Sequence, residues 1–478
     1  MRTGLILMPV LMIFCLSFLT VPSLAQDNTI RYWALIINGD SSFIADTDYM
    51  YHTLTHHYVF DGVYYLSPSF PHPGVNARAT KANVRSAITD WLTDHSDSND
   101  IVLIYFSGHG GGYHHEHRSI EGGRIDISGD EGSEVRESTL GYDANNDGDT
   151  DDWVGIDECL WIGNEQYWDD EMREDLSTLN YGRLIIILDA GAGNISRCFS
   201  GGFIDDISAT NRVVMTATNE TTYAWGDRDR DGFSEWSEVF IDALYGNNTH
   251  YDNGNIVIDN PINADVNGDG YVSIKEAWDY AWNNDDARLL GLTTPWLDDD
   301  GNGLPTFVNE RDVLDPDDGA VADSTWLPLH PTLNVISPTR SSPASAGAYD
   351  NPNHIQVTVE VTQGLPSTPP ITGLTMDNFT IKIGGKEATA SIIDTSIPGR
   401  YVFDVAPPEQ ESPGKYDLEV ILKYKGIETT DIEKEAVEYT AGKADVMLII
   451  DRSGSMRGQK IRDAKNSAKL FVDYMRDG

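Results

Sequence analysis

The sequence predicts an α/β protein: a three-layer α/β domain comes first, then a β-sandwich and the beginning of another α/β domain. Two observations carry this prediction. Apolar runs alternate with helical stretches as far as about Asn309, and a hydrophobic period of two follows. The 478 residues leave room for about three domains, and a hydrophobic share of 40% supplies material for their cores.

The first α/β domain, assigned to residues 26–315, is indicated by short apolar runs rich in β-branched residues. Such runs are typical of buried parallel strands, and they comprise 32–37, 101–106, 184–188 and 213–217. Residues 79–92 and 168–179 have the pattern of amphipathic helices. Strands and helices that alternate in this way predict a sheet with helices on both faces.

Composition changes after this domain. Residues 316–352 are rich in Pro, Asp and Ser, which predicts a linker. Apolar and polar residues alternate in 353–442, which predicts a small β-sandwich, and 413–418 is similar to the tyrosine-corner segment of immunoglobulin-like domains. Residues 443–478 contain one apolar strand, 446–450, and one helix from about Lys460, so they are expected to be the beginning of a further domain.

The N-terminal sequence indicates where the protein is located, and its overall charge limits the partners that it can bind. Residues 1–25 have the features of a secretory signal peptide, and no later apolar run approaches the roughly 20 residues that span a bilayer. A secreted or cell-surface protein without a transmembrane segment in the mature chain is therefore expected. The formal net charge of -43 argues against nucleic acid as a partner. So much carboxylate has three ordinary interpretations: solvation in salty surroundings, divalent cation binding, or attraction of basic substrates.

Two predicted strands are followed by residues that can act as a base and as a nucleophile. The strand 101–106 ends in Ser-Gly-His-Gly with His109, and 184–188 runs into Asp-Ala and later Cys198. Polar residues at the carboxyl edge of a parallel sheet are well placed for chemistry, and a histidine there can deprotonate a thiol.

These two blocks resemble those of the legumain, metacaspase and caspase clan of cysteine peptidases, over roughly residues 30–310. The resemblance implies the caspase-hemoglobinase fold and hydrolysis of protein or peptide substrates. It also implies that Cys198 is the nucleophile and His109 the general acid/base. The backbone N–H groups of Gly110 and Cys198 would form the oxyanion hole.

The spacing before Cys198 departs from that family, in which the cysteine follows the Asp-Ala pair directly. Either residues 191–197 bulge out and Cys198 keeps its role, or Gly191 takes the nucleophile position and the enzyme is inactive. The Ser-Gly-Gly-Phe sequence after Cys198 favours the bulge. A disulfide with Cys159 is a third alternative, although the apolar run around Cys159 indicates a buried residue instead.

A group of histidines lies just past His109. His114, His115 and His117, together with Glu116, could bind zinc. A solvated loop at the rim of the cleft is the favoured interpretation, because the sequence predicts no helix or strand that would fix their spacing.

Two acidic segments match the full twelve-residue EF-hand loop, which predicts calcium as a cofactor. In that loop alternate oxygen ligands converge on one cation, a Gly permits the sharp turn, and a final Glu binds bidentately. The ligand positions are Asp227, Asp229, Asp231, Phe233, Glu235 and Glu238 in the first loop, and Asp265, Asn267, Asp269, Tyr271, Ser273 and Glu276 in the second. Two further segments begin in the same way but lack the final Glu: Asp143, Asn145, Asp147 and Asp149, and Asp298, Asp300 and Asn302.

Asp451, Ser453 and Ser455 follow the apolar run 446–450 and resemble the metal-ion-dependent adhesion site of von Willebrand factor type A domains. The resemblance implies a divalent cation, but the family's Thr and second Asp ligands are absent, so no complete site is expected.

The sequence therefore favours a secreted, calcium-binding cysteine endopeptidase. The alternative is an inactive, peptidase-like surface adhesion protein that calcium stiffens and that binds a cell-surface ligand through its C-terminal modules.

Overall fold

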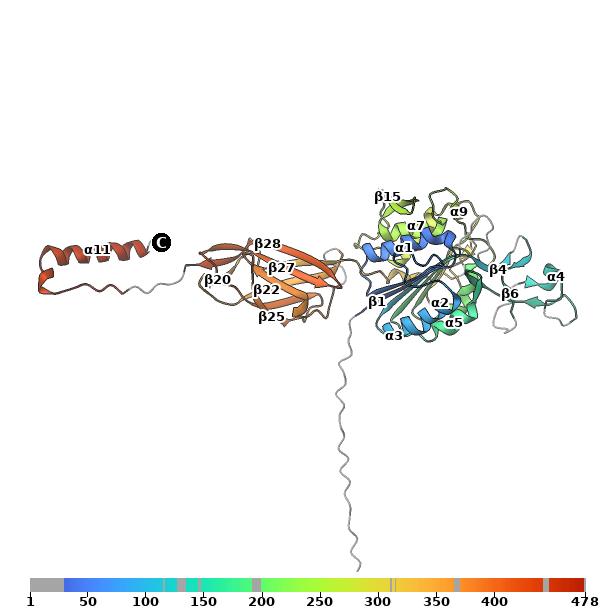
Figure 1. Cartoon of the computed structure of the whole chain (residues 1–478), viewed down its shortest axis with the longest axis horizontal. Coiled ribbons are helices and arrows are strands. Elements are labelled where there is room, and N and C mark those ends of the chain that lie inside the picture. The colour runs from blue at the N-terminus through green and yellow to red at the C-terminus, as the bar shows by residue number, and fades with distance from the viewer. Residues whose placement is uncertain are drawn as a thin grey trace, which may run out of the picture.

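The computed structural model describes residues 30–114, 117–126, 135–144, 148–190, 199–309, 312–313, 315–364, 370–441 and 447–476. The predicted signal peptide lies outside these residues. An α/β body, a two-sheet region and a C-terminal helix follow one another along the long axis (Figure 1). Within the described residues, no helix is both long and apolar enough to cross a bilayer.

The α/β body is built on a six-stranded sheet. Its strand order is β16 (Trp296–Asp298), β13 (Arg212–Thr216), β12 (Arg183–Asp189), β3 (Ile101–Ser107), β1 (Tyr32–Asn38) and β2 (Gly62–Leu66). All neighbours pair in parallel except the antiparallel edge strand β16. Every residue of β1 is buried, because helices cover both faces of the sheet.

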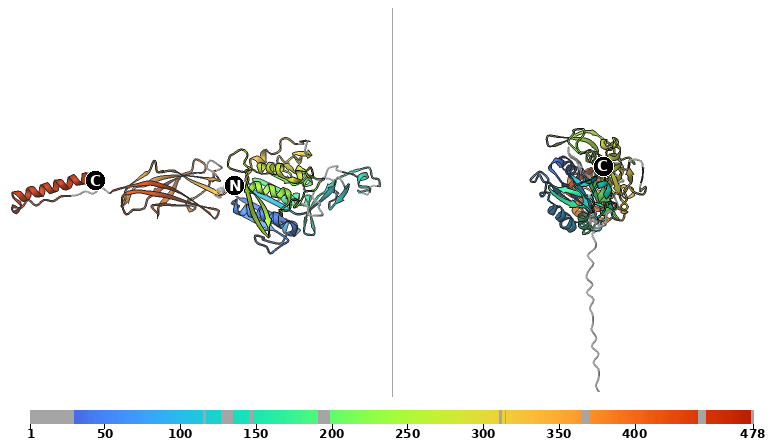
Figure 2. Two further views of the ribbon diagram at one scale, coloured as in Figure 1. Left: turned by 90° about the horizontal axis from the view of Figure 1, so that it is seen from above. Right: turned by 90° about the vertical axis from the view of Figure 1, so that its right-hand side faces the viewer.

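Helices form the two outer layers (Figures 1 and 2). One layer contains α1 (Ile44–His56), α7 (Glu235–Tyr245), α8 (Ile274–Asn284) and α9 (Asp286–Leu289), with α10 (Ala320–Asp323) against α8. The other contains α2 (Lys81–Ser86), the π-helical turn Ala87–Leu92, α3 (Thr93–His95), α5 (Asp169–Leu176) and α6 (Ile204–Ile207). Ala45, Tyr49 and Thr53 recur every four residues on α1 and are buried, which explains its packing on the sheet.

Smaller strand groups project from the body. A four-stranded sheet of β11 (Glu165–Trp168), β10 (Cys159–Ile162), β4 (Gly110–His114) and β5 (Ser119–Glu121) extends from the carboxyl end of β3. Two-stranded pairs are β6 (Arg124–Ile125) with β9 (Ile156–Asp157), β7 (Val135–Arg136) with β8 (Trp153–Val154), β14 (Asn247–Asp252) with β15 (Asn255–Pro261), and β17 (Phe307–Asn309) with β18 (Asp312–Val313). The turn α4 (Glu137–Leu140) follows β7.

The two-sheet region encloses a separate apolar core. One sheet has the order β19 (Pro331–Ser337), β22 (Ile355–Gln363), β26 (Arg400–Ala406), β25 (Thr389–Asp394). The other has the order β21 (Asn351–Pro352), β20 (Ala344–Ala348), β28 (Ile427–Thr440), β27 (Gly414–Tyr424), β23 (Phe379–Ile383), β24 (Lys386–Glu387). Alternate residues of β22 are buried, beginning with Ile355, Val357 and Val359.

The segment 316–352 differs from the predicted linker, since β19, β20 and β21 lie within it. Leu333 and Val335 of β19 belong to the buried core of the two-sheet region. The partner of β19 is β22, which begins at Ile355. Such non-local pairing is not visible in local composition, so the Pro- and Ser-rich sequence concealed the strands.

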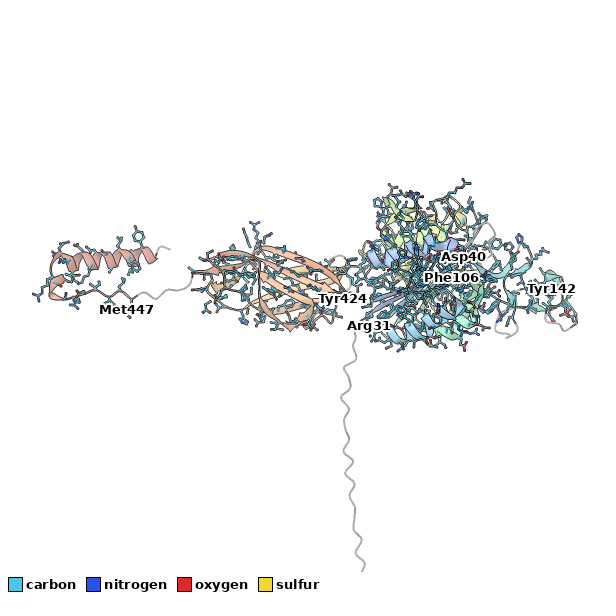
Figure 3. All side chains as sticks on the ribbon, viewed as in Figure 1. Arg31, Asp40, Phe106, Tyr142, Tyr424 and Met447 are labelled. Atoms are coloured by element: carbon cyan, nitrogen blue, oxygen red, sulfur yellow. The ribbon has the colours of Figure 1, made fainter. Side chains whose placement is uncertain are left out.

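The two-sheet region meets the α/β body through a partly buried ion pair. Lys425, in the turn between β27 and β28, pairs with Asp61, and the Lys425 side chain is only 10% exposed. Its ammonium also lies over the ring of Tyr32, 5.1 Å from the centroid. Asp61 accepts a second bond from the Tyr32 amide at 2.7 Å, so the contact is at the amino end of β1 (Figure 3).

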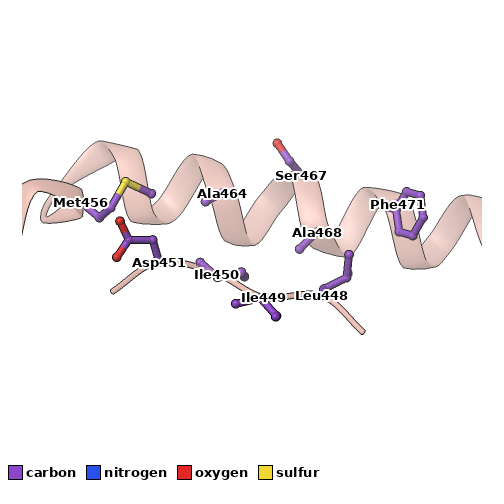
Figure 4. A pocket seen from close by; sticks show the side chains of 9 residues that line it. All are labelled: Leu448, Ile449, Ile450, Asp451, Met456, Ala464, Ser467, Ala468 and Phe471. Carbon is purple, nitrogen blue, oxygen red and sulfur yellow. The ribbon is translucent and has the colours of Figure 1, made fainter. Parts of the chain in front are cut away.

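The C-terminal segment makes few contacts. The helix α11 (Gln459–Arg476) matches the expected one, but residues 447–450 form no strand, and most of the predicted strand 446–450 is therefore wrong. A strand needs a hydrogen-bonded partner, and the described residues provide none here. Ile449 is 87% exposed, and an apolar groove runs between this segment and α11 (Figure 4).

Candidate active site and acidic loops

Three neighbouring strands of the central sheet end at one level. Asn38 of β1 and Asp189 of β12 both stand opposite Ser107 of β3. The Gly108 amide donates to the Asp189 carbonyl oxygen at 3.1 Å, which continues the ladder past the strand ends. A Cβ on Gly108 would lie 2.6 Å from the Phe106 ring and 2.9 Å from the Gly39 Cα, so only glycine fits this close approach.

His109 lies directly after this glycine, at the carboxyl edge of the sheet. Its ring packs edge-on against Phe43 with 4.9 Å between the centroids. Burial lowers the pKa of His109, and the nearby Asp40 carboxylate opposes that effect. The imidazole is therefore neutral near pH 7, which is the state that a general base requires.

Cys198 lies outside the described residues, as do Gly191 and the rest of 191–197. The residues on either side are described. Ala190 directly follows β12 and is fully buried. Phe199 is 1% exposed, and a Cβ on Gly112 of β4 would lie only 2.7 Å from the Phe199 Cβ. The residue after Cys198 is thus in contact with the strand that begins next to His109.

Gly110 begins β4 and stands opposite Leu160. The His109 carbonyl oxygen accepts a bond from the Trp161 amide at 2.8 Å. Because hydrogen-bonded pairs alternate along an antiparallel ladder, Gly110 occupies a non-bonded position, and its N–H points away from β10. An N–H directed away from the neighbouring strand can donate to another acceptor.

Cys159 is a free, buried thiol on β10. Burial raises its pKa to about 12, so it remains protonated and unreactive at neutral pH. Its Sγ lies 3.3 Å from the Gly122 carbonyl oxygen. The expectation of a small buried residue matches these surroundings.

Sequence reasoning missed a group of buried carboxylates close to Gly112 and Gly202. Glu158 is 1% exposed, and a Cβ on Gly202 would lie 2.2 Å from its Oε2. Asp157 pairs with Arg124, and burial raises the pKa of Asp169 to about 9. The signal was the acidic pair Asp157-Glu158 inside an otherwise apolar strand sequence, an environment that carboxylates normally avoid.

The first acidic loop brings its aspartates together. One carboxylate oxygen each of Asp227, Asp229 and Asp231 lies within 4.8 Å of the others. Burial raises the pKa of Glu238, and the facing Asp231 carboxylate raises it further. Phe233 stacks on Tyr49, which anchors the loop in the core, and the Glu235 carboxylate accepts the Arg228 amide at 2.7 Å.

In the second loop, backbone amides occupy the carboxylates. Asp265 accepts bonds from the amides of Gly268, Asp269 and Gly270, and Glu276 accepts bonds from those of Val266, Asn267 and Ser273. The Asn267 side chain accepts a bond from the Asp269 amide, and the Asp269 carboxylate accepts one from the Tyr271 amide. Ser273 caps α8 by accepting the Glu276 amide at 3.1 Å.

The two incomplete acidic segments acquire carboxylates from outside their patterns. Asp298 and Asp300 lie near Asp318, and burial raises the pKa of Asp318 to about 8. The side-chain amide of Asn302 donates hydrogen bonds to Asp300 and Asp315. Asp149 lies near Glu137 and Asp152, while Asn145 and Asp147 are outside the described residues. Asp143 accepts the Gly148 amide at 2.9 Å.

The three residues that resemble an adhesion site do come together. Ser453 Oγ lies 3.0 Å from Asp451 Oδ2 and 2.7 Å from Ser455 Oγ, and all three residues are exposed.

A buried polar network joins the first acidic loop to the strand edge. Asp46 accepts bonds from Ser107 Oγ at 2.8 Å and from Ser234 Oγ at 2.6 Å. Burial and the nearby Asp46 carboxylate raise the pKa of Asp189 to about 8. Ser237, at the start of α7, donates to Asp189. The loop is thus joined by side-chain hydrogen bonds to the ends of both β3 and β12.

A comparison with known proteins finds one matching family model. Residues 30–129 match the family model of the metacaspase, peptidase C14 domain. No curated protein matches the chain. A solved structure assigned as a β-galactosidase from Bacteroides fragilis is 21% identical over 24% of this chain and 13% of that chain, with a TM-score of 0.16. The endo-β-1,4-mannanase from Thermotoga petrophila is 10% identical over 84% and 72%, with a TM-score of 0.17.

With TM-scores this low, neither structure bears on the fold or the function. The family match covers β1, β3 and His109, and it supports a caspase-like cysteine peptidase.

Proposed function

We propose that this protein is a secreted cysteine endopeptidase in which Cys198 is the nucleophile and His109 the general acid/base. The observation that carries the proposal is the contact of Phe199 with Gly112 of β4. Since Phe199 directly follows Cys198, and β4 begins directly after His109, this contact favours a thiol close to the imidazole. The metacaspase peptidase match over residues 30–129 supports the same chemistry.

The proposed reaction proceeds through an acyl-enzyme. His109 takes the proton of the Cys198 thiol, and the sulfur attacks the scissile carbonyl carbon. The N–H groups of Gly110 and Cys198 stabilise the oxyanion of the tetrahedral intermediate. His109 then gives its proton to the leaving amine, and water hydrolyses the thioester.

We infer a preference for Arg or Lys at the cleavage site over the Asn that legumain prefers. Support comes from the net charge of -43, since an acidic protein attracts basic substrates. A peptide library in which only the residue before the scissile bond varies tests this preference.

We also propose calcium as a cofactor. The convergence of Asp227, Asp229 and Asp231 supports binding at the first loop, since hard cations take several carboxylate oxygens. The second loop has the same spacing of ligand positions. A divalent cation at Asp451, Ser453 and Ser455 is expected only in a complete adhesion domain.

The central test is the paired substitution of the dyad. Cys198→Ala and His109→Ala should each abolish peptide hydrolysis and leave the melting temperature unchanged, because each removes half of one catalytic unit. Cys159→Ala is the matched control, since its thiol is buried and protonated. Substantial turnover by Cys198→Ala would refute the assignment.

The alternative is an inactive, peptidase-like adhesion protein that calcium stiffens. The seven residues 191–197 between Ala190 and Cys198 favour it, because the related peptidases lack them. A thiol-directed peptide inhibitor distinguishes the two functions: it alkylates Cys198 in an active enzyme and leaves an inactive one unlabelled. Deleting 191–197 restores the family spacing and should preserve hydrolysis if the segment bulges out.

A further inference from the structure

Three side chains that can bind a transition metal converge on the β4–β5 hairpin. His114 ends β4, Glu121 ends β5, and His117 lies between them; one ligand atom of each lies within 4.8 Å of the other two. The strands fix the spacing of His114 and Glu121, because Gly112 pairs with Glu121 and His114 pairs with Ser119. The interpretation as a solvated loop therefore fails for His114, which is 5% exposed.

Neighbouring groups orient these side chains. His117 Nδ1 lies 2.9 Å from Glu121 Oε1, and Tyr223 Oη donates to Glu121 Oε2 at 2.7 Å. The Tyr223 ring stacks on that of His114 with 4.2 Å between the centroids. Groups that hold ligands in place in this way raise the affinity of metal sites.

We propose that His114, His117 and Glu121 bind a divalent transition-metal ion, with zinc as the best-fitting ion. Two imidazoles and one carboxylate form a known zinc donor set that leaves a fourth position open. Calcium prefers oxygen ligands alone, so this site differs in chemistry from the acidic loops. The proposal does not depend on peptidase activity.

The distances suit a small ion. Zinc–ligand bonds of about 2.0–2.1 Å place two tetrahedral ligands roughly 3.3 Å apart. The separation of His117 Nδ1 and Glu121 Oε1 is 2.9 Å. The two atoms therefore need to move apart only slightly for an ion to replace the proton that they share. The His117 amide donates to His114 Nδ1 at 3.0 Å, and coordination through that nitrogen exchanges this hydrogen bond for a metal bond.

The site adjoins the segment that carries the candidate nucleophile. The Phe199 ring lies 6.1 Å from His114 and 5.6 Å from Tyr223, between ring centroids. An ion on the hairpin would therefore be separated from Phe199, the residue after Cys198, by the rings of His114 and Tyr223. A test of binding must exclude that thiol as a ligand.

The test is calorimetric titration of the untagged full-length Cys198→Ala chain with Zn²⁺, in excess Ca²⁺ at pH 7.5. One zinc ion should bind per chain. His114→Ala, His117→Ala and Glu121→Gln in this background should each weaken binding at least tenfold. His354→Ala is the matched control, because His354 also pairs with a carboxylate, Asp404 at 2.8 Å, but lies in the two-sheet region; it should leave binding unchanged.

Two further measurements keep the outcome decisive. Melting curves without zinc check that the variants fold, and if His114→Ala does not, the exposed His117 carries the test. Undiminished zinc binding by His117→Ala and Glu121→Gln would overturn the proposal. Binding by the wild-type chain that disappears in Cys198→Ala would also overturn it, since the ion would then sit on the thiol. Because the test chain lacks the thiol, a failure of the zinc site is distinguishable from a failure of the proposed peptidase.

Discussion

The two complete acidic loops share one spacing, yet their carboxylates have different surroundings. In the first loop Asp227, Asp229 and Asp231 converge, and Glu238 faces Asp231. In the second loop, Asp265 and Glu276 each accept bonds from three backbone amides. Neighbouring like charges raise the free energy of the first loop, whereas amide dipoles already stabilise the second.

The comparison teaches that the motif specifies where a loop turns but not how strongly it needs a cation. Five ligand positions of the first loop carry a carboxylate, against three in the second, where Asn267 and Ser273 replace acids. Carboxylate number and rigidity set calcium affinity in such loops. We therefore expect the first loop to be the tighter and more consequential site.

Calcium removal should have the largest effect. Chelation exposes the repulsion within the first loop, so the α/β body should melt at a lower temperature while the two-sheet region is little affected. Ligand at a hundredfold excess over Kd contributes about 2.7 kcal/mol, which corresponds to roughly 5 °C or more for a domain of this size. Differential scanning calorimetry with calcium or with EGTA measures the shift. Coincident melting curves would contradict a structural calcium site.

Substituting the final glutamates should separate the two loops. Glu238→Gln should remove most of the calcium-dependent stability yet change little in EGTA, because its surroundings already favour the protonated acid. Glu276→Gln should lower stability by about 1 kcal/mol in both conditions, since an amide group accepts the three backbone bonds less well. Chemical denaturation of both variants, with and without calcium, tests this. Equal calcium dependence of the two variants would erase the distinction.

The pH dependence of folding stability should reflect the protonation of Glu238 in the first loop. The pKa of Glu238 is raised by burial and by Asp231, so the folded chain keeps a proton that the unfolded chain releases above about pH 4.3. Without calcium, stability should therefore fall as the pH rises above that range, by at most about 1.4 kcal/mol per pH unit for this group. Saturating calcium should remove the decline, because the ion takes the place of the proton. Denaturation midpoints between pH 5 and 8 in EGTA, for wild type and Glu238→Gln, measure it. A wild-type slope that Glu238→Gln leaves intact would assign the effect to other groups.

The smallest effect should come from adding one carboxylate to the second loop. Asn267→Asp gives that loop the acid that the first has at the same position, Asp229. Calcium affinity at the second loop should rise by a few fold, and stability in EGTA should fall by a few tenths of a kcal/mol through repulsion with Asp265 and Asp269. Calorimetric titration in the Glu238→Gln background isolates the second loop.

Much of the α/β body follows from local patterns. The apolar runs became β1, β3, β12 and β13, and the strand end before His109 predicted its place at the sheet edge. Part of what failed depends on contacts between distant residues: the strand β19 and the approach of Asp318 to Asp298 join segments that no local pattern connects. The β4–β5 hairpin is local, but its Gly- and His-rich sequence lacks the alternation of apolar and polar residues that predicts strands.

The ion pair between Lys425 and Asp61 has a consequence for how the sheet edge that carries His109 is presented. It fixes the two-sheet region at the amino end of β1, whereas His109 lies past the carboxyl end of the parallel neighbour β3. Strands of seven residues at about 3.3 Å per residue set these ends roughly 20 Å apart. The two-sheet region therefore lies away from the sheet edge that carries His109, which is marked in Figure 3 by Asp40 and Phe106. A chain held from its C-terminal side would present that edge outward, clear of the two-sheet region.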